Sequence, residues 1–167
     1  MPELYQPRLE DLWFKAQLLG DEQTCLDDGG YHAYSTIDDP GFSGDVQFLS
    51  KSNEHYAIPL REGGKTLGLL HIMPAHRGVK TAELGYVLNK SFRRQSYMKE
   101  ALRAVIDRLF KETGVKTITA KHDTENGKSG RVMQKAGMHL VEVRQKAAQN
   151  NLGLRDMAIY AIDNPYC

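Results

Sequence analysis

The basic segment Phe92–Met98 constrains the fold more than any other feature of the sequence. It is the junction between a predicted strand and a predicted helix. The residues before it, Glu83–Leu88, predict a strand, and an amphipathic helix follows it until Thr113-Gly114. The apolar residues of that helix recur at helical spacing: Tyr97, Met98, Ala101, Leu102, Val105, Ile106, Leu109 and Phe110. The first turn of such a helix would carry backbone N–H groups and the positive end of the peptide dipoles. Because two arginines stand beside it, the junction predicts a site for a phosphate.

The bulk composition predicts a single soluble domain, residues 1–167. The chain has 167 residues and 41% hydrophobic content, which suits one core and is short for two. Its net charge of +1 provides no general attraction to polyanions or anionic membrane surfaces, so neither nucleic acid nor a membrane is expected as a partner. No apolar run approaches the roughly 20 residues that cross a bilayer. Only Cys25 and Cys167 are present and no signal-peptide pattern is seen, so we expect a cytoplasmic location.

The remaining segments predict a mixed α/β order of elements. They are a strand at 4–6, a helix at 9–19, a long loop at 27–41 with a short helix near 46–49, strands at 56–60, 66–73 and 115–121, a helix at 126–136, and strands at 138–144 and 154–162. The strands before the junction are joined by short turns and predict an antiparallel meander. Helices alternate with strands only in the middle of the chain, which predicts a parallel crossover inside a mostly antiparallel sheet.

Three motifs in a fixed order carry a resemblance to a known family. They are Glu83-Leu84-Gly85-Tyr86, the turn Tyr97-Met98 followed by Glu100-Ala101, and Asn126-x-x-Ser129-x-Arg131 with Lys135-Ala136-Gly137. On these motifs the chain resembles the GNAT superfamily of acetyl-CoA-dependent N-acetyltransferases, and within it the ribosomal-protein N-acetyltransferase-like branch. The resemblance implies the GNAT fold, a splayed, mixed but mostly antiparallel sheet flanked by helices. It also implies that acetyl-CoA lies in the gap between the strands at 83–88 and 115–121.

The resemblance implies a site for acetyl-CoA along one strand and one turn. The backbone N–H groups of Tyr86, Val87 and Leu88 would pair with the pantetheine arm, and one of them would donate to the thioester oxygen. Asn126 and Ser129, one turn apart near a helix start, would aim an amide and a hydroxyl at the same cosubstrate. The alternative for these two residues is that they only cap the helix.

The basic junction becomes the site for the diphosphate of acetyl-CoA. Its residues are Arg93, Arg94, Gln95, Ser96, Tyr97 and Met98. It departs from the family pattern at three positions. Ser96 and Met98 stand where the family usually has a small residue, and Arg94 stands where the related branch often has glycine. Glycine is favoured wherever a loop requires positive φ or close approach of a ligand. We expect Ser96 to offer its N–H at negative φ, or to tolerate a conformation usually left to glycine.

Acetyl transfer to an amine needs a base and a proton donor. A lysine-like amine with a pKa near 10.4 is protonated at neutral pH, and freeing it costs about 4–5 kcal/mol. Glu83 is the candidate general base, acting directly or through one water, with an ordinary salt-bridged strand glutamate as the alternative. Ser129 would donate a hydrogen bond or a proton to the leaving sulfur, and Tyr160 is a second candidate for that role.

Acceptor recognition is expected in regions that wall the acceptor cleft in the family. These are the helix at 9–19, the loop that carries Tyr31 and Tyr34, and the hairpin between Arg144 and Leu154. The loop is acidic because it contains Asp27, Asp28, Asp38 and Asp39. Such a loop would suit a cationic amine, either a small molecule such as a polyamine or aminoglycoside, or a protein N-terminus. The alternative for each aspartate is a solvated turn.

The sequence leaves three classes of function open. The first is an amine N-acetyltransferase that uses acetyl-CoA by direct attack, as a monomer or homodimer. The second is a catalytically silent CoA-binding regulatory or scaffold module, and the third is an unrelated phosphate-binding α/β domain. No metal is expected, because the six histidines and Cys25 show no metal-ligand spacing.

Overall fold

The computed structural model of the chain describes residues 22–28, 34–36, 38–60, 66–74, 78–150 and 152–166. Several features considered from the sequence lie outside these residues: the strand at 4–6, the helix at 9–19, Tyr31 and Cys167. The side chains of Asp27 and Asp28 are also outside the described part.

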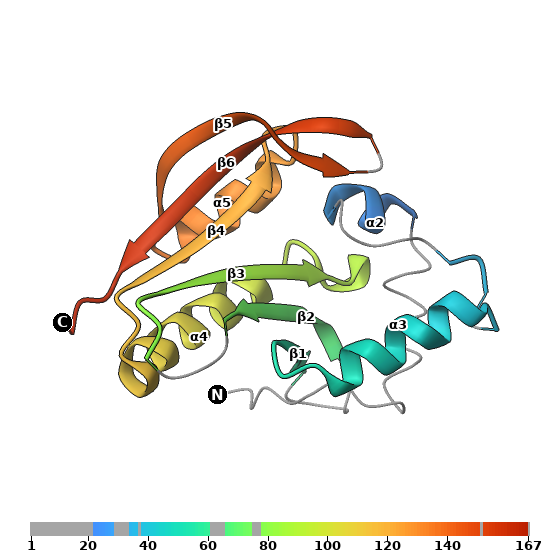
Figure 1. Cartoon of the computed structure of the whole chain (residues 1–167), viewed down its shortest axis with the longest axis horizontal. Coiled ribbons are helices and arrows are strands. Elements are labelled where there is room, and N and C mark those ends of the chain that lie inside the picture. Colours follow the sequence, from blue (N-terminus) through green and yellow to red (C-terminus); the bar gives the residue numbers. More distant parts are fainter. Residues whose placement is uncertain are drawn as a thin grey trace. The chain divides into compact units, whose positions relative to one another are not determined.

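Six strands form one sheet in the order β1-β2-β3-β4-β6-β5 (Figure 1). They are β1 (His55–Pro59), β2 (Thr66–Met73), β3 (Thr81–Leu88), β4 (Thr117–Asp123), β5 (His139–Asn150) and β6 (Gly153–Asp163). β3 pairs with β4 in parallel, whereas the β1–β2, β4–β6 and β5–β6 pairs are antiparallel. The predicted mixed, mostly antiparallel sheet with one parallel crossover is therefore confirmed.

The helices agree with the sequence in the second half of the chain and differ in the first. α4 (Tyr97–Thr113) and α5 (Gly127–Lys135) lie where they were expected, and a 3-10 helix, η2 (Lys90–Phe92), precedes the junction. α2 (Glu22–Asp28) was not predicted, and α3 (Pro40–Lys51) is much longer than the short helix expected near 46–49.

The early start of α3 has a local cause. Asp39 stands at the N-cap and its carboxylate accepts the N–H of Gly41 at 2.8 Å, while Pro40 occupies the first helical position. Phe42, Val46 and Leu49 are buried along one face of the helix. The prediction placed Asp39 and Pro40 in the long loop at 27–41, whereas they start the helix.

The chain divides into two compact units. The first contains the described residues up to His71 together with Tyr86–Gln95. Its core includes a cluster of Leu49, Leu69 and Val87. A Cβ at Gly68 would lie 2.2 Å from the Val87 carbonyl oxygen, so only glycine fits there. The second unit contains Ile72–Gly85 and the described residues from Ser96 onward. The single domain expected from the length stays a prediction.

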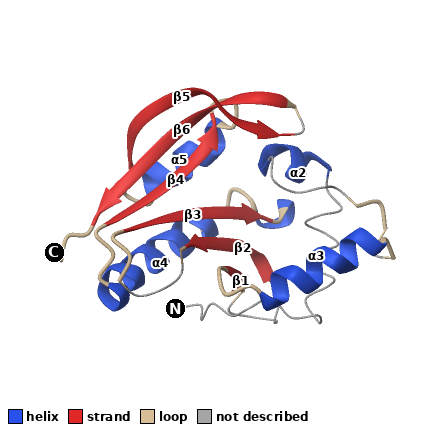
Figure 2. Cartoon of the chain, in the orientation of Figure 1, coloured by secondary structure: helices blue, strands red, loops and turns tan. Residues whose placement is uncertain are grey.

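The second unit has one covered and one open sheet face. Along β4, Ile118, Ala120 and His122 are buried, whereas the alternate residues Thr119, Lys121 and Asp123 are not. Figure 2 shows α5 running along β4 and β6, and α5 contacts both strands. Because Gly130 of α5 lies against the ring of His122, the buried residues of β4 face this helix. Thr119, Lys121 and Asp123 therefore lie on the opposite face.

The substitution Gly130→Ala tests the packing of α5 against β4. Its added Cβ would lie 2.6 Å from His122 Nε2 and 3.1 Å from the Tyr160 hydroxyl. The His122 ring cannot easily move, since its Nδ1 lies 2.6 Å from the Asp123 carbonyl oxygen. We expect Gly130→Ala to lower the free energy of unfolding by about 1–3 kcal/mol through overpacking.

The matched control for Gly130 is Gly127→Ala in the same helix. Its Cβ would meet only an Arg131 nitrogen, at 4.0 Å, so the substitution should stabilise the protein by up to about 1 kcal/mol. Chemical denaturation measures both variants. Equal effects of the two alanines would contradict the close approach of α5 to β4.

Candidate active site

The parallel pairing of β3 with β4 ends before either strand does. Registered pairs run from Thr81 and Thr117 to Leu84 and Ala120. β3 then continues to Leu88 and β4 to Asp123. β3 and β4 are the two strands between which the family resemblance placed acetyl-CoA.

Glu83 lies near the end of this pairing, on the open face of the second unit. It pairs in register with Thr119, and its carboxylate contacts the side chain of Lys121, two residues further along β4. Lys121 Nζ lies 2.9 Å from Glu83 Oε1 and 3.2 Å from Oε2. The two side chains are 32% and 48% exposed for Glu83 and Lys121, respectively. The salt-bridged state considered from the sequence is thus present, and the carboxylate remains within reach of a solute.

The turn from β4 into α5 presents Asn126 and Ser129. The N–H of Asn126 donates to the Asp123 carbonyl oxygen at 2.8 Å, and the N–H of Ser129 donates to the Asn126 carbonyl oxygen at 3.0 Å. Asn126 stands at the N-cap of α5, but its side chain makes no capping hydrogen bond. The capping alternative therefore does not account for the Asn126 amide.

Tyr160 lies on the covered face. It pairs with Ala120, is 6% exposed, and its hydroxyl accepts a long 3.5 Å hydrogen bond from Gln134 Nε2 of α5. Its ring lies 5.6 Å from that of His122. Tyr160 and Glu83 are thus on opposite faces of the sheet, and Ser129 belongs to the helix that covers the face of Tyr160.

The side chain of Arg93 braces the junction. Its Nη2 donates to Thr24 Oγ1 of α2 at 2.8 Å, and its Nε donates to the Leu88 carbonyl oxygen at 3.4 Å. Before it, the buried side chain of Asn89 accepts the N–H of Ser91 at 2.9 Å, which starts η2. These bonds hold the end of β3, η2 and α2 together within the first unit. Arg93 was expected to bind a diphosphate, but in this structure its guanidinium contacts Thr24 and the Leu88 carbonyl oxygen.

The backbone of the junction adopts the conformation of a glycine loop without glycine. Arg94 and Ser96 both have φ of 65°, and Ser96 has ψ of 0°. The first alternative for Ser96, a negative φ, is therefore wrong, and the second holds. Left-handed conformation costs a non-glycine residue roughly 1–2 kcal/mol. The Ser96 carbonyl oxygen accepts the N–H of Glu100 at 3.1 Å, so the amides between them form the first turn of α4.

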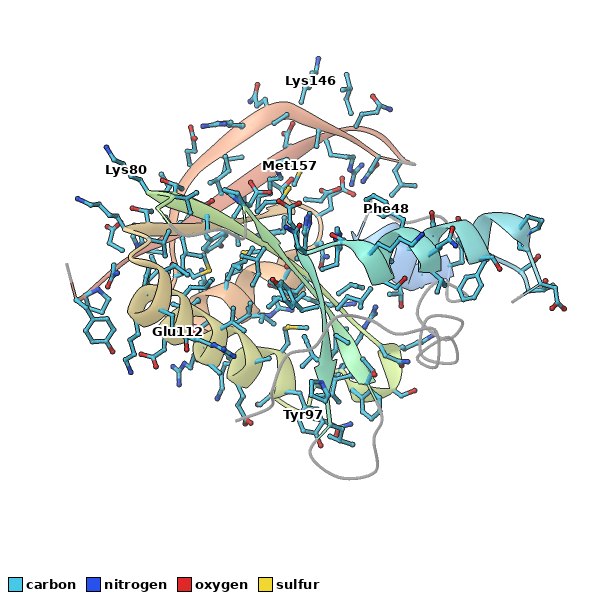
Figure 3. All side chains as sticks on the ribbon, turned by 60° about the horizontal axis from the view of Figure 1, so that its bottom comes forward. Phe48, Lys80, Tyr97, Glu112, Lys146 and Met157 are labelled. Atoms are coloured by element: carbon cyan, nitrogen blue, oxygen red, sulfur yellow. The ribbon has the colours of Figure 1, made fainter. Side chains whose placement is uncertain are left out.

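Side chains around the junction point in different directions. Met98 is 4% exposed and belongs to the core, so only its backbone is available to a ligand. Arg94, Gln95 and Ser96 are exposed. Figure 3 shows Tyr97 and Glu112 toward opposite ends of α4. An anion at the start of α4 would meet exposed polar residues and no buried carboxylate from this segment.

Tyr34, the described member of the predicted acceptor pair, is held by α3. Its hydroxyl donates to Asp45 Oδ2 at 2.7 Å, and its ring packs edge-on against Phe42 at 5.6 Å. The hydrogen bond to Asp45, followed by burial, raises the pKa of Tyr34 to about 12. Asp39 of the acidic loop caps α3. Both contacts belong to the first unit, and acceptor binding by Tyr34 stays a prediction.

Sequence reasoning missed two ion-paired groups on the open face of β4. Lys121 is one of them, and Asp123, paired with Arg155 of β6, is the other. The signal that could have found them is the alternation along β4, which places Thr119, Lys121 and Asp123 on one face. Within the described residues, no helix could cross a membrane, and no three potential metal ligands lie together.

Comparison with known proteins identifies relatives of the chain. The profile of the acetyltransferase (GNAT) domain family matches residues 13–139. Over 119 residues the chain is 33% identical to the probable N-acetyltransferase YjcK of Bacillus subtilis (strain 168), covering 70% of this chain and 66% of that protein. It is also 33% identical over 85 residues to the uncharacterized N-acetyltransferase YnaD of the same organism, covering 51% and 49% of the two chains. The matches thus span less than two thirds of each relative.

Solved structures share the fold at low identity. An acetyltransferase (GNAT family) from Bacillus anthracis has a TM-score of 0.85 at 22% identity, covering 98% of this chain and 97% of that one. Spermidine N-acetyltransferase from Vibrio cholerae, in complex with CoA and spermine, has a TM-score of 0.76 at 13% identity, with coverage of 97% and 95%. Ribosomal-protein-S5-alanine acetyltransferase from Vibrio fischeri has a TM-score of 0.76 at 19% identity, with coverage of 98% and 92%. The predicted fold is confirmed.

The positive φ of Ser96 generates a stability prediction. Replacing Ser96 with glycine should raise the free energy of unfolding by about 0.5–1 kcal/mol, because glycine adopts this conformation without a Cβ clash. The control is Ser91→Gly in η2, where φ is not positive and glycine should destabilise the protein slightly. Thermal unfolding of both variants measures the difference. A loss of stability in both would show that Ser96 does not hold the left-handed conformation in solution.

Proposed function

The chain belongs to the acetyltransferase (GNAT) domain family, and on that premise we propose that it is an acetyl-CoA-dependent N-acetyltransferase. The acceptor is a primary amine, which attacks the thioester directly. The observation that carries this proposal is the position of Glu83, an accessible carboxylate on the open face near the end of the β3–β4 pairing. The cytoplasmic location and the choice between monomer and homodimer stay predictions.

The residues of the chain suit acetyl-CoA in three places. The left-handed residues Arg94 and Ser96 shape the start of α4 as a glycine loop would, which supports a diphosphate site formed by the backbone of residues 95–98 and the exposed Arg94. Tyr86, Val87 and Leu88 lie on β3 beyond its last registered pair with β4, which supports their backbone pairing with the pantetheine arm. Asn126, at the start of α5, is the third place where we expect contact with acetyl-CoA.

The chemistry needs two proton transfers. The amine nitrogen forms a bond to the thioester carbonyl carbon, and the carbon–sulfur bond breaks to release CoA. Glu83 takes the proton that the amine loses, directly or through one water, and passes it to solvent. Ser129 donates a hydrogen bond or a proton to the departing sulfur, and a proton from solvent replaces any that it gives. Ser129 is on the covering helix and Glu83 is on the open face, so both would reach one thioester only beyond the end of the β3–β4 pairing.

Lys121 defines how an amine would meet Glu83. Its ammonium contacts both carboxylate oxygens, so an incoming cationic acceptor competes with Lys121 for the same partner. The acceptor class proposed is a small amine such as a polyamine, or a protein N-terminus. Two structural neighbours are named for such acceptors, one for spermidine and one for a ribosomal protein. The proposal also includes membership of the ribosomal-protein N-acetyltransferase-like branch, which would make a protein N-terminus the acceptor.

The same ion pair favours a second candidate function. A carboxylate held permanently by Lys121 would take no proton from an acceptor, and the chain would then be a CoA-binding regulatory or scaffold module. The two candidates agree on cosubstrate binding and differ in turnover.

Thermal stabilisation by acetyl-CoA followed by thiol release across an amine panel separates these candidates. The panel contains spermidine, an aminoglycoside and a peptide with a free N-terminal alanine. An enzyme should be stabilised by acetyl-CoA and release CoA thiol with at least one amine. Stabilisation without thiol release from a broad panel supports the binding module. No stabilisation at millimolar acetyl-CoA would contradict both.

Glu83→Gln tests the base. We expect kcat to fall by about 100-fold at neutral pH while the affinity for acetyl-CoA is kept, because the amide cannot accept the proton. The matched control is Glu142→Gln, another strand glutamate paired to a cation, Arg144 of the edge strand β5. An unchanged kcat in Glu83→Gln would remove Glu83 as base. If Lys121→Met lowers kcat equally, Glu83 acts only as the partner of Lys121.

A further inference from the structure

Arg155 connects three elements around the turn that presents Asn126. Its Nε donates to Asp123 Oδ2 at 2.5 Å, and its Nη2 donates to Glu125 Oε2 at 2.5 Å. Arg155 lies on β6, Asp123 ends β4, and Glu125 lies in the loop before α5. The side chains of Arg155 and Asp123 are each 15% exposed, so this ion pair is mostly sheltered from solvent, whereas Glu125 is 76% exposed.

The two carboxylates that Arg155 holds also shape the turn. Asp123 Oδ1 accepts the N–H of Glu125 at 3.0 Å, and the Asp123 carbonyl oxygen accepts the N–H of Asn126 at 2.8 Å. Burial opposes the charged form of Asp123, but hydrogen bonds from Arg155 and from the Glu125 N–H outweigh it. The pKa of Asp123 therefore lies below its ordinary value. Asp123 is an ionised carboxylate that orders the residues up to Asn126.

The guanidinium of Arg155 makes both contacts at once through two different nitrogens. A guanidinium presents several N–H groups in one plane, whereas an ammonium is a single point charge. Without Arg155, the negative charges of Asp123 and Glu125 would face each other uncompensated across the turn. The backbone of the turn at Asn126 would then be less firmly held, although the hydrogen bond from the Thr124 N–H to the Asp156 carbonyl oxygen would still tie the turn to β6.

We propose that Arg155 is a positioning residue for acetyl-CoA binding, because its guanidinium fixes the turn that aims Asn126 at the cosubstrate. Arg155 acts through Asp123 and Glu125 and touches neither the acetyl group nor the acceptor. This inference rests on the proposed function, and it predicts that substitutions at Arg155 and Asn126 are coupled. It also predicts local loosening of the turn whether or not acetyl-CoA is present.

Hydrogen exchange of the protein without ligand tests the positioning directly. In Arg155→Met, the amides of Glu125, Asn126 and Ser129 should exchange at least about tenfold faster, while the amides of α4 keep their rates. The control is Arg144→Met, which breaks an exposed arginine–glutamate pair on the neighbouring strand and should leave the turn unchanged. Glu125→Ala, at a side chain that is 76% exposed, should accelerate the same amides to a smaller extent. Unchanged exchange in Arg155→Met would overturn the proposal.

A double-mutant cycle with CoA affinity tests the consequence. Asn126→Ala and Arg155→Met should each weaken CoA binding by about fivefold, and the double variant should bind about as weakly as Asn126→Ala alone. Independent, multiplied effects would overturn the proposal, as would faster exchange with unchanged affinity. If the unsubstituted protein does not bind CoA, the proposed function fails, while the exchange experiment still decides whether Arg155 positions the turn.

Discussion

The parallel ladder between β3 and β4 stops at Leu84 and Ala120, and the chemistry of the second unit is arranged around that point. Before it, the strands share their backbone hydrogen bonds, and side chains alternate strictly between a covered and an open face. Glu83 and Thr119 are the last registered pair on the open face. Lys121, the first residue of β4 beyond the ladder, reaches back to Glu83. The position of the candidate base is therefore set by strand register, which is more rigid than a loop.

Charge on the open face is balanced locally. Lys121 and Asp123 are neighbouring residues on the open face of β4 and carry opposite charges. Each forms an ion pair with an adjacent strand, Lys121 with Glu83 of β3 and Asp123 with Arg155 of β6. The two pairs differ in exposure. The Glu83 pair is accessible, and a solute can exchange with it, whereas the Asp123 pair is largely sheltered and fixes the turn to Asn126. This difference separates a group suited to proton transfer from a group suited to holding geometry.

The sequence located α4, α5 and the six strands, but it ended the strand at 138–144 too early, because β5 continues to Asn150. It also did not predict α2 and underestimated α3. Helical spacing from Tyr97 to Phe110 and the Gly114 stop located α4 because one apolar face is buried along its length. α3 was underestimated because Pro40, Gly41, Ser43 and Gly44 have low helix propensity, and its stability depends on tertiary burial and on the Asp39 cap. Propensity cannot reveal a helix of this kind.

The sequence was enough to predict which residue types form the candidate site. It was not enough to predict which of these side chains contact each other. The sequence identified positions where glycine is expected, and the structure shows that Arg94 and Ser96 adopt the corresponding backbone conformation. It could not show that Arg93 contacts Thr24, 69 residues earlier in the chain, or that Lys121 contacts Glu83. These pairings depend on which strands become neighbours, which local patterns do not contain.

We propose that three segments of the chain each contact acetyl-CoA: residues 86–88, the loop at 94–98 and the turn at 126–129. Amide chemical shifts of isotope-labelled protein, followed during titration with acetyl-CoA, test it most directly. We expect the largest changes to fall in these three segments, while the exposed edge strand β5 and the outer part of α3 are unaffected. Largest changes in β5 or α3, with the three segments unmoved, would contradict it.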